Sequence, residues 1–65
     1  MLEKQLAYNI SEAGQTSKTG RTAIYDAIRS GELRAVKRGR RTLILAHDLR
    51  RWLESLPTVP PKNGH

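Results

Sequence analysis

Apolar residues spaced at helical intervals predict a helix from Gly20 to Ser30, in the middle of the chain. A projection at about 100° per residue gathers its apolar side chains on one side of the helix axis, and these are Ala23, Ile24, Ala27 and Ile28. Arg21 and Arg29 lie on the opposite side. Gly31 follows directly and is a favourable residue to end the helix. We therefore expect one face of this helix to pack on a core and the other to present positive charge.

A second amphipathic helix is predicted from Ala46 to Leu56. Its apolar residues recur at positions i, i+3, i+4 and i+7, namely Leu49, Trp52, Leu53 and Leu56. Asp48 in the first turn complements the positive end of the helix dipole, and Pro57 marks the end of the helix. We expect Trp52 to lie in the core.

Between these two helices, the sequence predicts a β-hairpin. Residues 33–38 and 41–45 contain β-forming residues and flank a short loop at Gly39-Arg40. If Ile44 points into the core beside Val36, the alternation of a strand places Leu43 and Leu45 on its other face. Two alternatives stay open for these leucines: contact with a neighbouring copy of the protein, or burial through a twist of the strand.

A short first helix is predicted from Glu12 to Ser17, with Ser11 as its N-cap. Gly14 and Thr16 lower its helix propensity, so that it needs tertiary packing to persist. The chain then divides into an N-terminal arm at residues 1–9, which gives no strong secondary-structure signal, a folded domain at 10–56 and a flexible proline-rich tail at 57–65.

The 65 residues allow one small domain, and the absence of cysteine excludes disulfides and thiolate metal sites. The longest apolar run, Leu43 to Ala46, is far shorter than the ~20 residues that cross a bilayer. The N-terminus lacks the features of a signal peptide. These observations predict a soluble intracellular protein with no membrane partner.

Positive charge is concentrated in the middle of the chain. Twelve Lys or Arg residues stand against six acids, and residues 18–51 hold ten of the basic residues but only three acids. Such an excess favours a polyanionic partner, with nucleic acid first. A solubilising surface, a protein-interaction module for an acidic partner and RNA binding are the alternatives. RNA is disfavoured because the chain has few aromatic residues to stack on unpaired bases.

The order of helix, tight turn, helix, basic hairpin and helix predicts a small α+β fold of the winged helix-turn-helix type, in which the second helix enters the DNA major groove. The candidate contacts of that recognition helix are Arg21, Thr22, Tyr25, Asp26 and Arg29. Lys18 in the turn is a further candidate. The candidates in the wing are Lys37, Arg38, Gly39, Arg40 and Arg41.

These residue types suit the contacts that DNA offers. Arginine pairs with guanine O6 and N7, threonine contacts a thymine methyl group, and loop arginines neutralise phosphates. Tyr25 either bonds a phosphate or covers the edge of the core. Asp26 either accepts from a cytosine amino group or holds Arg29, three residues away. Arg50 and Arg51 form a solvated helix face or a secondary phosphate contact.

The sequence offers no catalytic site. There is no thiol nucleophile, and His47 and His65 show no metal-ligand spacing with each other or with the acids. Arg38-Gly39-Arg40 lacks the pattern of a phosphate-binding loop. We therefore predict that the protein is not an enzyme and holds neither a metal nor a cofactor.

Several short motifs in residues 8–56 resemble the excisionase-type, MerR-like winged helix domain. They are Ile10-Ser11-Glu12-Ala13, Arg21-Thr22-Ala23-Ile24-Tyr25, Ile28-Arg29-Ser30-Gly31-Glu32-Leu33, Val36-Lys37-Arg38-Gly39 and Asp48-Leu49-Arg50-Arg51-Trp52-Leu53. The chain departs from that pattern at Lys18, where the family commonly has glycine, and at Thr16 and Ser17, where it commonly has leucine.

The resemblance implies sequence-specific binding of double-stranded DNA in the bacterial cytoplasm or nucleoid. It implies an excisionase, also called a recombination directionality factor, that directs a tyrosine or serine integrase toward excision of a mobile element. It also implies head-to-tail self-association on direct repeats, for which the exposed face of Leu43 and Leu45 is the candidate surface. A small transcription regulator bound to promoter repeats is the alternative.

Overall fold

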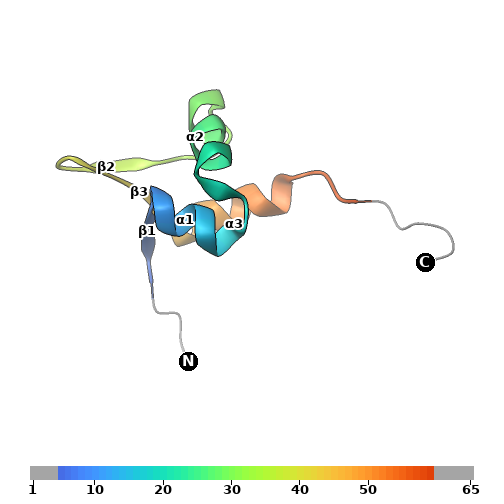
Figure 1. Ribbon diagram of the computed structural model, residues 1–65, viewed down its shortest axis with the longest axis horizontal. Coiled ribbons are helices and arrows are strands. Elements are labelled where there is room, and N and C mark those ends of the chain that lie inside the picture. The colour runs from blue at the N-terminus through green and yellow to red at the C-terminus, as the bar shows by residue number, and fades with distance from the viewer. Residues whose placement is uncertain (1–4, 60–65) are drawn as a thin grey trace, which may run out of the picture.

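The computed structural model describes residues 5–59, in which three helices and three strands follow one another closely (Figure 1). In chain order they are β1 (Ala7–Asn9), α1 (Ile10–Ser17), α2 (Gly20–Ser30), β2 (Val36–Arg38), β3 (Arg41–Leu45) and α3 (Ala46–Ser55). The hairpin of β2 and β3, residues 36–45, projects from the body and is the wing. The winged helix-turn-helix class predicted from the sequence is confirmed. The bounds of α2 are confirmed as well, and α3 ends one residue earlier than predicted.

The wing has the two strands that the sequence predicts, and a third strand, β1, which the sequence does not predict, completes the sheet. β1 pairs antiparallel with β3, with Tyr8 opposite Ile44, and the strand order is β1-β3-β2. Residues 7–9 therefore form part of the folded body and are not an arm. Residues 1–4 of the predicted arm and 60–65 of the predicted tail lie outside the described residues, while residues 57–59 are exposed and have no regular secondary structure.

The first helix begins at Ile10, two residues before the predicted start, because its N-cap is Asn9 and not Ser11. The Asn9 side chain accepts a hydrogen bond from the Glu12 backbone N–H at 2.8 Å. The Glu12 carboxylate accepts one from the Asn9 backbone N–H at 3.0 Å. These reciprocal bonds form a capping box, which satisfies two donors at the strand-to-helix junction.

α1 and α2 approach closely through Gly14. A Cβ atom at this position would lie 2.8 Å from the carbonyl carbon of Gly20, so only glycine fits without moving backbone. The turn between the helices is short because Lys18 adopts a left-handed conformation with φ 64°. The N–H groups of Lys18 and Thr19 bond back to the carbonyls of Gln15 and Gly14, which is the pattern of a Schellman motif. This geometry sets the angle at which α2 leaves α1.

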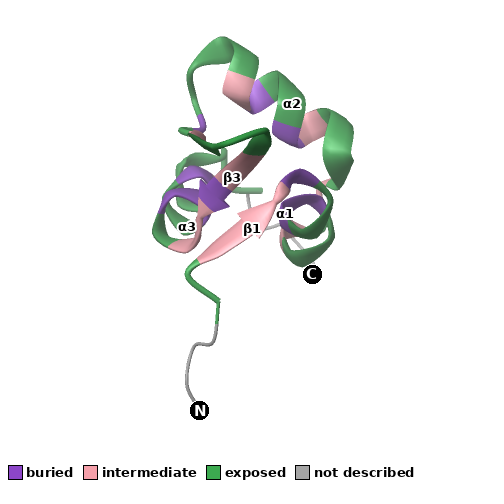
Figure 2. Ribbon diagram, turned by 90° about the vertical axis from the view of Figure 1, so that its left-hand side faces the viewer, coloured by how far each residue is buried: buried purple, intermediate pink, exposed green. Residues whose placement is uncertain are grey.

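The core lies between the three helices and the central strand. Its buried residues are Ile10, Ala13, Ile24, Ala27, Leu33, Ile44, Leu49 and Trp52. Figure 2 shows the buried parts of the helices facing inward and the exposed parts facing outward. The expected burial of Trp52 is confirmed. Asp48 is also buried, and Arg34 lies 3.7 Å from its carboxylate, so that an ion pair joins α3 to the segment leading into the wing.

The register of the wing corrects the expected place of Val36. The two-residue loop pairs Arg38 with Arg41 and therefore Val36 with Leu43, so that Val36 lies on the face of Leu43 and not beside Ile44. Ile44 is buried as expected. Leu43 and Leu45 are half-buried on the opposite face and do not belong to the core cluster.

Candidate nucleic-acid interface

A basic cleft of about 450 Å³ opens between α2, the wing and the start of α1. α2 contributes Arg21 and Tyr25, and the wing contributes Arg40, Arg41 and Thr42. Asn9, Ile10 and Ser11 complete the cleft at the beginning of α1. The structure thus brings together charged residues that are about twenty positions apart in the sequence.

α2 presents its polar face to solvent because its apolar face is anchored in the core. Ile24 and Ala27 are buried, whereas the five predicted recognition residues, Arg21, Thr22, Tyr25, Asp26 and Arg29, are all exposed. Tyr25 is 51% exposed and lines the basic cleft, which favours a phosphate contact over its alternative role of covering the core edge.

The two ends of the polar face of α2 differ in their ion pairing. Arg29 lies 3.4 Å from Asp26, one turn earlier, which favours the interpretation that this acid holds the arginine in place. Arg21 forms no ion pair with any of residues 5–59. The arginine at the start of the helix therefore meets an external anion without a competing acid, whereas Arg29 first gives up a weak, exposed pair.

The N-terminus of α2 is electrostatically unfavourable on its own but well suited to an anion. Its first turn holds no acid and no side chain caps it, because the Thr19 hydroxyl bonds to the Ser17 hydroxyl at 2.7 Å. Arg21 adds a positive charge at the end of the helix that is already positive. A phosphate placed there would satisfy the free N–H groups at the start of the helix and the helix dipole.

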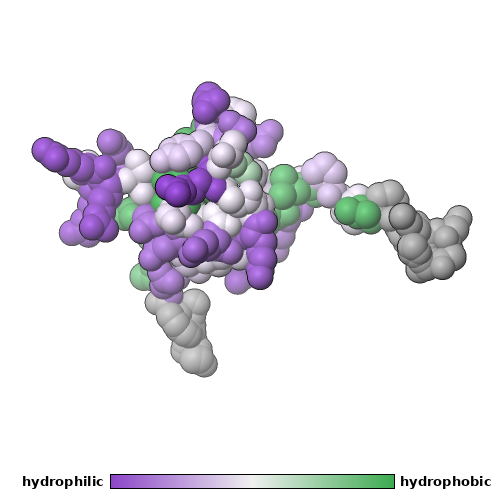
Figure 3. All heavy atoms as spheres, viewed as in Figure 1, coloured by the Kyte–Doolittle hydropathy of each residue, from purple (hydrophilic) through white to green (hydrophobic). Residues whose placement is uncertain are grey.

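The wing carries its charge at an exposed tip. Lys37, Arg38, Gly39, Arg40 and Arg41 are all exposed, and Figure 3 shows strongly hydrophilic side chains gathered where the wing projects. Gly39 has φ 59° whereas Arg40 has no positive φ, as in a type II′ turn, whose first central position favours glycine. This turn allows a two-residue loop, Gly39-Arg40, to connect the strands with a charged residue on each side, Arg38 and Arg41.

Part of the predicted site lies in the basic cleft and part lies outside it. Of the predicted residues, Arg21, Tyr25, Arg40 and Arg41 line the cleft. The predicted residues that do not line it are Lys18, Thr22, Asp26, Arg29, Lys37, Arg38 and Gly39. Three polar residues of the cleft were not predicted: Asn9, Ser11 and Thr42. That the first helix of a helix-turn-helix crosses the DNA backbone is a general hint for Asn9 and Ser11, but it does not identify these residues, and Thr42 belongs to β3.

The family described as a helix-turn-helix domain matches residues 7–57. The chain belongs to the helix-turn-helix domain family. The match begins at the first residue of β1, so the helix-turn-helix domain includes the strand that sequence reasoning placed in the arm. Searches of curated proteins and of solved structures found no match to this chain. Membership of the family implies DNA binding.

Two further observations bear on other kinds of site. Within residues 5–59, no group of three or more His, Cys, Asp or Glu side chains is arranged to hold a metal ion. No helix in the same stretch combines the length and the hydropathy that crossing a membrane requires.

Proposed function

We propose that this helix-turn-helix domain binds double-stranded DNA sequence-specifically and without catalysis, with α2 in the major groove and the wing on the flanking backbone or minor groove. The observation that carries the proposal is the shared basic cleft. Arg21 of α2 and Arg40 and Arg41 of the wing line the same hollow, so one duplex can contact both elements at once. The uncapped start of α2 beside this cleft adds a further attraction for phosphate.

Salt-dependent titration tests this proposal. Duplex DNA and single-stranded RNA are each titrated with the protein over a range of salt concentrations. If about six phosphates are neutralised, log K for the duplex falls against log salt with a slope of about −5. A flat response, or tighter binding of the RNA, contradicts the proposal.

Arg21 is proposed to read a base rather than only a phosphate. Arg21→Ala then reduces the discrimination between a specific and a random duplex by about 1–3 kcal/mol, because a bidentate guanine contact is lost. Competition binding with the two duplexes measures this difference. If the variant loses affinity equally for both, Arg21 positions the protein on the backbone and does not read sequence.

Within DNA binding, we propose that the protein is an excisionase that binds attachment-site DNA in the bacterial cytoplasm and directs a tyrosine or serine integrase toward excision. The support is the set of motifs from Ile10-Ser11-Glu12-Ala13 to Asp48-Leu49-Arg50-Arg51-Trp52-Leu53. An excision assay with purified integrase and a plasmid carrying the attachment sites tests this role. Excision that proceeds equally well without the protein favours the alternative, a MerR-like transcription regulator on promoter repeats.

We also propose that copies associate head-to-tail on adjacent repeats through the outer face of the sheet. Leu43 and Leu45 are half-buried there, and register places Val36 and Ala7 beside them. None of the four belongs to the core cluster or packs against it. Leu43→Ser is expected to lower the cooperativity of binding to DNA with several repeats. Equal cooperativity for the variant and the wild type contradicts this part of the proposal.

A further inference from the structure

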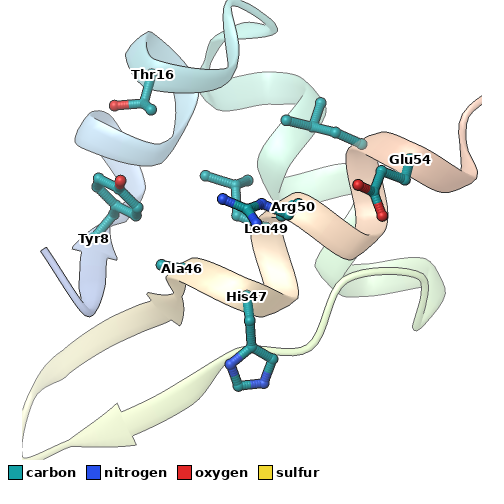
Figure 4. A pocket seen from close by; sticks show the side chains of 8 residues that line it. Tyr8, Thr16, Ala46, His47, Leu49, Arg50 and Glu54 are labelled. Atoms are coloured by element: carbon teal, nitrogen blue, oxygen red, sulfur yellow. The ribbon is translucent and has the colours of Figure 1, made fainter. Parts of the chain in front are cut away.

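A second hollow, of about 490 Å³, lies between α1 and α3 beside β1 (Figure 4). We call it the α1–α3 groove. It shares no lining residue with the basic cleft. In Figure 1, α2 and the wing border one side of the molecule, whereas α3 leads away from them toward the C-terminus. A molecule in this groove would therefore leave the basic cleft free.

The α1–α3 groove is apolar at its base. Leu49 is buried, and Leu53 and Tyr8 are half-buried and pack on the core cluster. On the side of α1, the small side chain of Thr16 leaves the space above these residues open.

Two opposite charges stand at the rim of the groove, one helical turn apart on α3. Arg50 and Glu54 are both exposed and both line the groove. Neither forms an ion pair within residues 5–59, although their i, i+4 spacing would allow them to pair with each other. A complementary occupant must therefore present an apolar side chain flanked by an acid and a base one turn apart.

α3 itself presents this pattern, since Leu53, whose side chain is only half-buried, lies between Arg50 and Glu54, and its exposed part can meet Leu53 of a second copy. We infer that α3 of a second copy of this chain packs antiparallel on α3 across the groove and forms a two-fold dimer. In this arrangement Arg50 of each copy faces Glu54 of the other, so the same two residues supply both halves of the interface.

The pairing of opposite charges matters because each copy carries a net charge of +6. Two such bodies repel each other unless the contact surface is locally complementary. The two-fold contact provides that complementarity while both basic clefts remain outside it. This dimer differs in surface and in symmetry from head-to-tail association through the sheet.

Sedimentation equilibrium of the 65-residue chain without DNA tests the inference. From about 10 µM to about 500 µM, the wild-type average mass is expected to rise from the monomer value of 7.3 kDa toward twice that value. Arg50→Glu and Glu54→Arg each turn two attractive contacts into two repulsive ones, and each should weaken dimerisation about tenfold or more. The double variant Arg50→Glu/Glu54→Arg restores opposite charges and should recover the dimer.

Arg51→Glu is the matched control, because it makes the same charge change on the same helix but outside the α1–α3 groove. It should leave dimerisation within about twofold of the corresponding wild-type value. Circular dichroism of each variant shows that the exposed substitutions leave the fold intact.

A wild type that stays monomeric over this range overturns the inference, as does a double variant that fails to recover. Dimerisation that survives both single variants overturns it too, because another surface then holds the copies together. An equimolar mixture of the two single variants offers an independent check. In the mixed dimer, the acidic substitution at position 50 of one copy faces the basic substitution at position 54 of the other, so the mixture should dimerise. None of these measurements involves DNA, so their outcome does not depend on whether the proposed DNA-binding function is correct.

Discussion

Lys18 holds a strained backbone position. It is the one non-glycine residue among the described residues with a positive φ, 64°, and it ends α1 in the left-handed region. That region costs an L-residue about 1–2 kcal/mol, because Cβ crowds the following carbonyl. The strain persists because the turn needs this conformation to bring α2 against α1 at Gly14.

Lys18→Gly should therefore stabilise the fold. Relief of the left-handed strain exceeds the extra chain entropy of glycine, about 0.5–1 kcal/mol, and leaves a net gain of about 0.5–1 kcal/mol. Urea denaturation measures this gain. If Lys18 also contacts DNA phosphate, the variant binds duplex more weakly even though it is more stable.

Lys18→Ala separates the two effects, because it removes the charge but retains Cβ. It should weaken duplex binding as much as Lys18→Gly while leaving the free energy of unfolding near the wild-type value. A glycine variant that is no more stable than the alanine variant would show that the turn is not strained at this residue.

At the scale of elements, α1 depends on its N-cap more than on its composition. Asn9→Ala removes an acceptor of the capping box and should lower the free energy of unfolding by about 1 kcal/mol. Ser11→Ala is the control, since Ser11 lies inside the helix and its side chain makes no hydrogen bond within residues 5–59. Thermal unfolding of both variants decides which residue caps α1. Equal destabilisation by the two substitutions would contradict the capping box.

The elements that sequence reasoning found are those with a local signal. α2 was predicted to the residue because its apolar period and Gly31 are both contained in a twelve-residue window. β1 was missed because three residues, Ala7 to Asn9, show no measurable alternation, and their hydrogen-bond partners lie more than thirty positions away in β3. The N-cap of α1 was misplaced for the same reason, since Asn9 is also the last residue of that strand.

The face of Val36 could have been predicted correctly. A two-residue loop at Gly39-Arg40 already pairs Arg38 with Arg41, and counting outward along both strands pairs Val36 with Leu43. Hydrophobicity alone does not decide the face, because Val36, Leu43 and Ile44 are all apolar. Register therefore outweighs residue type in deciding which face of a short hairpin a side chain occupies.

At the scale of the whole molecule, the basic side chains form a binding surface only where the fold brings them close together. The sequence identified the basic residues of α2 and of the wing, but their meeting in one cleft depends on the tight turn at Lys18 and on the sheet that fixes the wing. The contribution of Asn9 and Ser11 to that cleft depends in addition on β1, which no local pattern in the sequence predicts. For this reason the polar face of α2 was predictable and the complete cleft was not.

Two arginines with the same charge test whether geometry or net charge governs DNA binding. Arg40 lines the basic cleft, whereas Arg51 is exposed on α3 beside Asp48 and Trp52. If the cleft holds the phosphate backbone, Arg40→Ala weakens binding to all duplexes about equally and reduces the salt slope by about 0.9. Arg51→Ala should change neither quantity, because its charge lies outside the contact. Equal losses for the two variants would mean that the net charge attracts DNA without a defined orientation, and the shared cleft would then have no part in recognition.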